Sequence, residues 1–139
     1  MAKADFDRDG DVDLIITNYK DRAHYYVNKV AKGHWLQIRL RGRQSNRDGV
    51  GSIIRIRARG DRQMRVISAG DGYASQFSRV AHFGLGKNEV IEELEVFWPS
   101  GKKQIFEGVL ADQMIEIDED ATKARVIMAR QTASSPSGR

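Results

Sequence analysis

Hydrophobic and polar residues alternate through most of the chain, a pattern that predicts β-strands. In HWLQIRL (34–40), Leu36, Ile38 and Leu40 fall on one face, and similar alternation returns in 52–60, 62–70, 91–98, 102–109 and 113–119. Turn residues separate these segments: Gly60-Asp61 suits a tight hairpin, and Pro99-Ser100-Gly101 suits a β-turn. Short strands between such turns are typical of an antiparallel β-sandwich or a barrel-like domain.

The two ends of the chain break this pattern. Residues 119–131, EDATKARVIMARQ, are predicted to form a short helix, and 132–139, TASSPSGR, a disordered tail. Near the N-terminus an acidic run leads into the strand-forming LIITN (14–18), and we place a seam at 29–33. The predicted organisation is therefore a small N-terminal unit (4–30), an all-β domain (34–118) and a C-terminal helix with a tail (119–139).

Composition narrows the classes of protein. The 139 residues are 40% hydrophobic, with a mean hydropathy of -0.53. Neither an apolar run of about 18 residues, as a membrane helix needs, nor the apolar centre of a signal peptide at the N-terminus is present. Cysteine is absent, which excludes disulfides, thiolate metal ligands and a cysteine nucleophile.

Five aspartates alternate with other residues in DFDRDGDVD (5–13): Asp5, Asp7, Asp9, Asp11 and Asp13. Such close carboxylates repel one another unless a cation neutralises them. Counted from Asp5, the side chains at positions 1, 3, 5 and 9 can converge on one ion, while position 7 offers its carbonyl. Gly10 at position 6 permits the sharp turn that calcium loops require. We expect calcium rather than magnesium, because magnesium rarely uses an all-carboxylate cage.

This loop departs from an EF-hand in two ways. Position 12 is Ile16 where an EF-hand has a glutamate, and the following segment forms a strand rather than a helix. The loop with LIITN and YYVNK (25–29) instead resembles the closing part of an FG-GAP/VCBS repeat, the unit of integrin-α-like β-propellers. Later segments resemble an ASPIC and UnbV domain in their order: NRDGVGSIIRI (46–56), SAGDGYASQ (68–76), HFGLG (82–86) and LEVFWPSGKKQ (94–104).

The resemblance covers about residues 4–118 and implies a cartilage acidic protein family member. One incomplete propeller blade implies a piece of a longer protein, and the lack of cysteine favours a bacterial-type member. It further implies calcium in the repeat, an extracellular, cell-surface or periplasmic location, and no established catalytic activity. The expected function is thus a non-enzymatic interaction module for a protein or glycan ligand.

Several alternatives stay open. Asp71, Tyr73, Gln76 and His82 would suit a ligand patch for a carbohydrate or peptide. A nucleic acid or another polyanion is the alternative ligand, because basic residues dominate the segment 39–65. The arginines that would bind it are Arg39, Arg41, Arg43, Arg47, Arg55, Arg57, Arg59, Arg62 and Arg65. Few aromatic residues lie among these arginines, which argues against base stacking. A homodimer through the edge of strand 14–18 is a further hypothesis.

Overall fold

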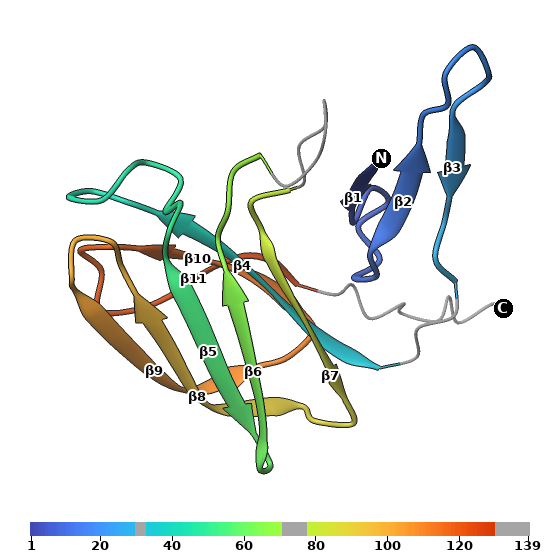
Figure 1. The fold of residues 1–139 in the computed structure, drawn as a ribbon. Coiled ribbons are helices and arrows are strands. Elements are labelled where there is room, and N and C mark those ends of the chain that lie inside the picture. Colours follow the sequence, from blue (N-terminus) through green and yellow to red (C-terminus); the bar gives the residue numbers. More distant parts are fainter. Residues whose placement is uncertain (30–32, 71–77, 130–139) are drawn as a thin grey trace, which may run out of the picture.

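The computed structural model describes residues 1–29, 33–70 and 78–129 (Figure 1). Within these residues the regular secondary structure consists of β-strands alone. The strands lie in three sheets, with orders β1-β2-β3, β11-β10-β4-β7 and β6-β5-β8-β9. Their bounds are β1 Ala2–Ala4, β2 Asp13–Ile16, β3 His24–Tyr26, β4 His34–Arg41, β5 Ile53–Ala58, β6 Asp61–Val66, β7 Ala81–Gly86, β8 Val90–Phe97, β9 Lys103–Leu110, β10 Gln113–Asp118 and β11 Arg125–Ala129.

The two four-stranded sheets form a β-sandwich around one hydrophobic core, as the alternation predicts. Leu36, Ile38 and Phe83 come from one sheet, and Ile54 and Leu94 come from the other. All five are fully buried. Neither of these sheets closes into a barrel, so the sandwich form of the prediction is confirmed.

One strand pair is parallel, which the alternation did not indicate. β4 lies beside β10 from Leu36↔Gln113 to Arg41↔Asp118. The chain reaches β10 from the opposite sheet, where β8 and β9 form an antiparallel hairpin. This crossover from one layer to the other lets β10 run in the same direction as β4, so the sheet is mixed.

The predicted helix over 119–131 is wrong for its described part. Residues Arg125–Ala129 form β11 and pair antiparallel with β10, with Met114 opposite Met128. Ala, Lys, Arg and Met permit a helix, but the open edge of β10 offers backbone partners, and such pairing overrides weak local propensity. The predicted tail, 132–139, lies outside the described residues.

The hairpin between β5 and β6 is confirmed, one residue earlier than expected. Ala58 pairs with Asp61, so the two turn residues are Arg59 and Gly60. Both have positive φ, 45° and 87°. Two such residues are typical of the turn that matches the right-handed twist of paired strands.

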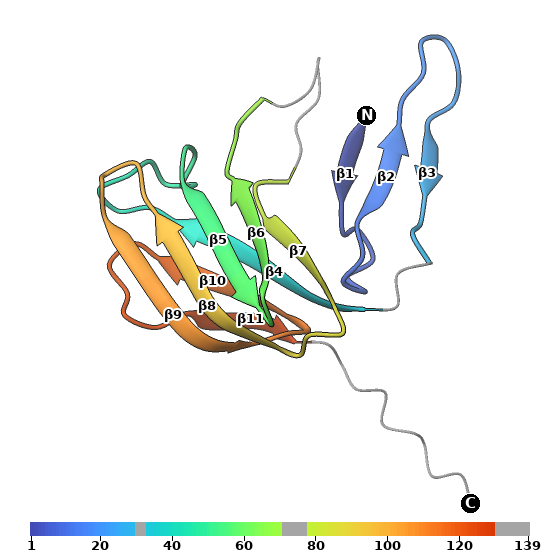
Figure 2. The same ribbon diagram turned by 60° about the horizontal axis from the view of Figure 1, so that its bottom comes forward.

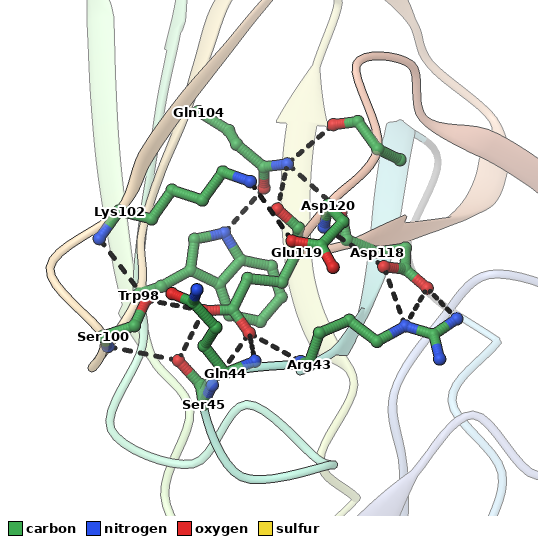
Figure 3. Close-up of polar contacts among 11 residues, drawn as sticks. Arg43, Gln44, Ser45, Trp98, Ser100, Lys102, Gln104, Asp118, Glu119 and Asp120 are labelled. Carbon is green, nitrogen blue, oxygen red and sulfur yellow. Dashed lines mark hydrogen bonds and ion pairs between the residues drawn. The ribbon is translucent and has the colours of Figure 1, made fainter.

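A buried carboxylate ties the end of β10 to the loop after β4 (Figure 3). Glu119 is completely buried, and its Oε2 accepts the backbone N–H groups of Arg43, Gln44 and Ser45 at 2.5, 2.8 and 2.8 Å. Its Oε1 accepts the hydroxyls of Ser45 and Ser100 at 2.8 and 2.5 Å. Burial alone would raise the pKa of this carboxyl, but these donors lower it to about 2.

Gln104 extends the same cluster to the core. Its Oε1 accepts the Trp98 indole N–H at 2.6 Å, and its Nε2 donates to the carbonyls of Asp118, Glu119 and Ala121. Beside it, the turn after β8 is closed by the N–H of Gly101 to the carbonyl of Trp98 at 2.9 Å, as predicted. Together these bonds satisfy polar groups that would otherwise be buried without partners.

The N-terminal sheet stands beside the sandwich, on the side of β7 (Figures 1 and 2). β2 is its middle strand, paired with β1 through Leu14↔Lys3 and with β3 through Leu14↔Tyr26. The hypothesis of an edge at 14–18 is therefore wrong for residues 14–16, because both edges of β2 are already paired. The predicted seam at 29–33 falls mainly on residues 30–32, outside the described part.

The loop between β1 and β2 covers the outer face of β4. Trp35 and Gln37 alternate with Leu36 and Ile38 and so lie on the face of β4 opposite the core, yet their exposed fractions are only 3% and 6%. A Cβ added to Gly10 would lie 2.0 Å from the Trp35 Nε1, which shows how closely the backbone approaches the indole. Gln37 Nε2 donates to Asp5 at 2.7 Å. The aspartate loop is thus held against the sandwich.

Candidate metal centre

Three of the five predicted carboxylates converge. One oxygen each from Asp5, Asp7 and Asp13 lies within 4.8 Å of the others. Asp5 follows β1 and Asp13 begins β2, so the antiparallel pairing of these strands brings the two ends of the loop together. These are positions 1, 3 and 9 of the loop, three of the four side chains expected to bind.

Asp13 is the fixed member of the group. It is 1% exposed, and it accepts the N–H of Asn28 at 2.9 Å and the N–H of Phe6 at 3.1 Å. The Tyr25 hydroxyl donates at 3.2 Å. Burial alone would raise the pKa of Asp13, but these donors outweigh it and lower the pKa, so the carboxylate stays ionised. Its remaining lone pairs can still bind a cation.

The two carboxylate oxygens of Asp5 differ in their hydrogen bonding. Its Oδ2 accepts the N–H of Gly10 at 3.1 Å and the amide of Gln37 at 2.7 Å. Its Oδ1 is buried and has no hydrogen-bond partner in the described part of the chain. A buried carboxylate oxygen without a donor is costly unless something else stabilises it. A cation at this oxygen would remove the cost, so the residues present fit a metal.

Asp7 is exposed, and the negative charges of its neighbours affect its pKa. Its pKa is raised, first by desolvation and then by the charges of Asp9 and Asp13, although the N–H of Asp9 counteracts the rise. A nearby cation would reverse the effect of these charges and favour the ionised form. Hard oxygen ligands at these positions suit calcium.

Asp9 and Asp11 lie outside the converging group. Asp7 Oδ1 accepts the N–H of Asp9 at 3.3 Å, and Asp9 Oδ1 accepts the N–H of Asp11 at 2.9 Å. These contacts shape the turn, which Gly10 completes with a φ of 98°. The side chain of Asp9 therefore supports the loop in this conformation.

Gln37 and Trp35 were missed as supports of this loop. The hint in the sequence was a tryptophan and a glutamine on the predicted outer face of strand 34–41, where arginines otherwise prevail. An amphipathic residue and an amide suit a surface that another segment covers.

Of the predicted ligand patch, only His82 can be assessed; Asp71, Tyr73 and Gln76 lie outside the described residues. The His82 Nδ1 is buried without a hydrogen-bond partner. Desolvation lowers the pKa of this imidazole, helped by the charge of Arg65 and opposed by that of Asp5. Among the described residues, no carboxylate bonds to this Nδ1, although a catalytic histidine normally has such an orienting partner.

The arginine-rich segment 39–65 is partly neutralised by carboxylates. Arg57 contacts Glu92 at 3.0 Å and Glu93 at 3.8 Å. Arg43 pairs with Asp118 at 2.8 Å. These pairs reduce the positive potential that a nucleic acid would need on this surface.

The comparisons with known proteins agree with the sequence motifs. The family model described as ASPIC and UnbV matches residues 42–124, more than half of the chain. The chain belongs to the ASPIC and UnbV family. The matched part of this ASPIC and UnbV chain includes β5–β10 and the Glu119 cluster, whereas the aspartate loop precedes it.

Two relatives are both named cartilage acidic protein 1. The ASPIC and UnbV chain is 33% identical to that of Xenopus tropicalis over 105 residues, 73% of this chain and 16% of the relative. It is 33% identical to that of Homo sapiens over 102 residues, 70% of this chain and 15% of the relative. The chain therefore spans about a sixth of the length of these relatives. Within the described residues, no helix is long and apolar enough to cross a membrane.

Proposed function

We propose that this chain is a non-enzymatic, calcium-binding interaction module of an extracellular, cell-surface or periplasmic protein. In this proposal residues 4–30 are the closing part of an FG-GAP/VCBS repeat, and the β-sandwich that follows presents the recognition surface. The extracellular location rests on the relatives named cartilage acidic protein 1. The non-enzymatic role likewise rests on these relatives, whose name is that of a cartilage protein.

The convergence of Asp5, Asp7 and Asp13 is the observation that carries the metal part. The buried Asp5 Oδ1 without a donor supports it independently. Calcium would take oxygens of these three carboxylates and complete its shell with carbonyl or water oxygens. Because Asp5 also binds Gln37, the ion would stabilise the contact between the loop and the sandwich.

The test is calorimetric titration of calcium into the chelator-treated protein, beside Asp7→Asn. Asp7 suits this purpose because it is exposed, whereas Asp13 holds three hydrogen bonds that the fold needs. We expect saturable one-site binding that weakens about tenfold or more in the variant, as the loss of a charged ligand predicts. Asp61→Asn, an exposed acid at the start of β6, is the matched control and should bind as the wild type does.

Absence of calcium-dependent heat in the folded wild type would refute the metal site. Equal loss of affinity in Asp7→Asn and Asp61→Asn would show a general effect of charge instead. A parallel titration with magnesium should give much weaker binding, because magnesium demands a tighter octahedral shell.

A further inference from the structure

A cleft of about 810 Å³ lies between the N-terminal sheet and the outer face of the β11-β10-β4-β7 sheet. Its walls include Lys3 and Arg8 from the N-terminal unit, Gln37 and Arg39 from β4, and Met128 from β11. Strands far apart in the sequence thus contribute to one concave surface, and both views place β1 beside this sheet (Figures 1 and 2).

The charge of the cleft is positive on balance, although one of its cations, Arg79, pairs with Asp48. The described lining residues include five cations and one carboxylate, that of Asp5: the cations are Lys3, Arg8, Arg39, Arg65 and Arg79. Low-dielectric walls of one sign concentrate ligands of the other sign. The Oδ2 of Asp5 accepts hydrogen bonds from the Gly10 N–H and the Gln37 amide. The cleft therefore favours an anionic ligand.

Two of these guanidinium groups are well placed to receive a carboxylate. The Nε of Arg65 donates a hydrogen bond to the carbonyl of His82 at 3.2 Å, and its guanidinium stacks 5.2 Å from the centre of the Phe83 ring. These two contacts fix the position of Arg65. Arg39 is half exposed, and its nearest carboxylate, on Glu116, is 3.9 Å away. Arginines fixed by neutral groups, or only loosely paired, can pair bidentately with an incoming carboxylate.

A second, independent observation is the buried Nδ1 of His82, which lines the cleft and has no hydrogen-bond partner. Buried polar atoms in native structures normally have partners. A hydrogen-bonding group of a ligand bound at this wall would reduce the cost of burying the unpartnered nitrogen.

The rest of the wall indicates what kind of anion would fit. Val66, Val80 and Ile127 add apolar surface next to the arginines, and Val66 and Ile127 are well exposed. No phenylalanine, tyrosine or tryptophan is among the described lining residues, so a platform for stacking a sugar or a base is missing there. β1 and β11, which both line the cleft, are edge strands that pair on one side only among the described strands. An extended peptide can add to such an edge.

We propose that this cleft binds an extended acidic peptide segment of a partner protein, with carboxylates at Arg39 and Arg65 and apolar side chains against Val66 and Ile127. The chain's own residues 130–139 do not fit as the occupant, because they carry two arginines and no acid. The inference rests on the proposed role as an interaction module, and names its ligand class, but it does not require the metal.

The experiment uses a fluorescein-labelled peptide of alternating valine and glutamate, with a valine-glutamine peptide as its control. Binding is followed by fluorescence anisotropy in the full chain. We expect saturable binding of the glutamate peptide only, weakened about tenfold or more by Arg39→Gln/Arg65→Gln. Arg57→Gln is the control, because Arg57, with a side chain 42% exposed against 51% for Arg39, lies on the opposite sheet and should change affinity less than about twofold.

Three results would overturn the proposal. These are no binding of the glutamate peptide, equal binding of the glutamine peptide, or equal weakening by Arg57→Gln. Binding of a heparin oligosaccharide that is lost in the double variant, without peptide binding, would assign the cleft to a sulfated glycan instead. If the double variant fails to unfold cooperatively, the single variant Arg39→Gln is used instead. Amide chemical-shift mapping with the peptide then tests the site, and changes are expected at Ala81 and His82.

The two proposals can fail separately. Peptide binding is measured with excess calcium and with chelator, and also in Asp7→Asn. Peptide binding without calcium binding would refute the metal site and leave the acidic-peptide cleft standing. Calcium binding without peptide binding would have the opposite meaning.

Discussion

Replacement of Glu119 by glutamine isolates the effect of one buried negative charge. The amide keeps the shape of the side chain, and its oxygen can still accept the N–H groups of Arg43, Gln44 and Ser45. The serine hydroxyls can turn to accept from the new NH₂ group. What disappears is the ionised form that these donors stabilise.

The magnitude follows from the pKa. The folded chain lowers the pKa of Glu119 from 4.5 to about 2, a difference worth about 3 kcal/mol of unfolding free energy at neutral pH. Because the folded-state pKa is the lower one, this contribution is complete above pH 4.5. It is lost as the pH falls to about 2. We therefore expect Glu119→Gln to be about 3 kcal/mol less stable at pH 7, with the difference vanishing in strong acid.

Urea unfolding at a series of pH values measures this difference. Trp98 lies in the same cluster, so its fluorescence reports on it (Figure 3). Glu107→Gln, at an exposed position of β9, is the control and should change the unfolding free energy by less than about 0.5 kcal/mol. Equal stability of Glu119→Gln and wild type at pH 7, or parallel pH profiles, would refute the assignment of a stabilising buried charge.

Other substitutions test the loop, the hairpin and the histidine. Gly10→Ala should cost about 2 kcal/mol or more and weaken calcium binding, since its Cβ would meet Trp35 and its φ is 98°; unchanged calorimetry would contradict the docking of the loop. Gly60→Ala should cost about 1 kcal/mol in urea unfolding and Gly60→Asn less, because asparagine tolerates positive φ; equal costs would argue against the turn. The His82 ring should titrate below 6.5 by NMR, so stability falls as the pH drops below that value; a pKa above 6.5 would contradict its burial.

Much of the sandwich could be predicted because each strand carries its own evidence. Leu94 and Val96 alternate with charged residues, and a proline ends their strand at Pro99. Such local patterns depend on one face being buried, which holds for β5 and β8. The convergence of Asp5, Asp7 and Asp13 was predictable for a similar reason, because the loop's spacing brings these side chains together; that a cation binds there stays a prediction.

What the sequence could not show depends on contacts between distant segments. The parallel pairing of β4 with β10 leaves no mark in either strand. β11 was predicted as a helix because its residues allow both structures, and only the open edge of β10 decides. Glu119 lies in an acidic stretch, which is typical of solvated surface. Its burial is possible because hydrogen-bond donors about 75 residues earlier in the chain contact its carboxylate.

The tie between Glu119 and the loop after β4 has a consequence for synthesis of the chain on the ribosome. β4 is made early, but its second neighbour in the sheet, β10, and the carboxylate that orders the loop at 43–45 are made late, with only β11 of the described strands after them. Until then one edge of β4 lacks its strand partner, and such long-range strand pairing is slow. The nascent chain is thus most prone to aggregation just before residue 119 emerges, and a chaperone that shields extended apolar segments would act in that interval.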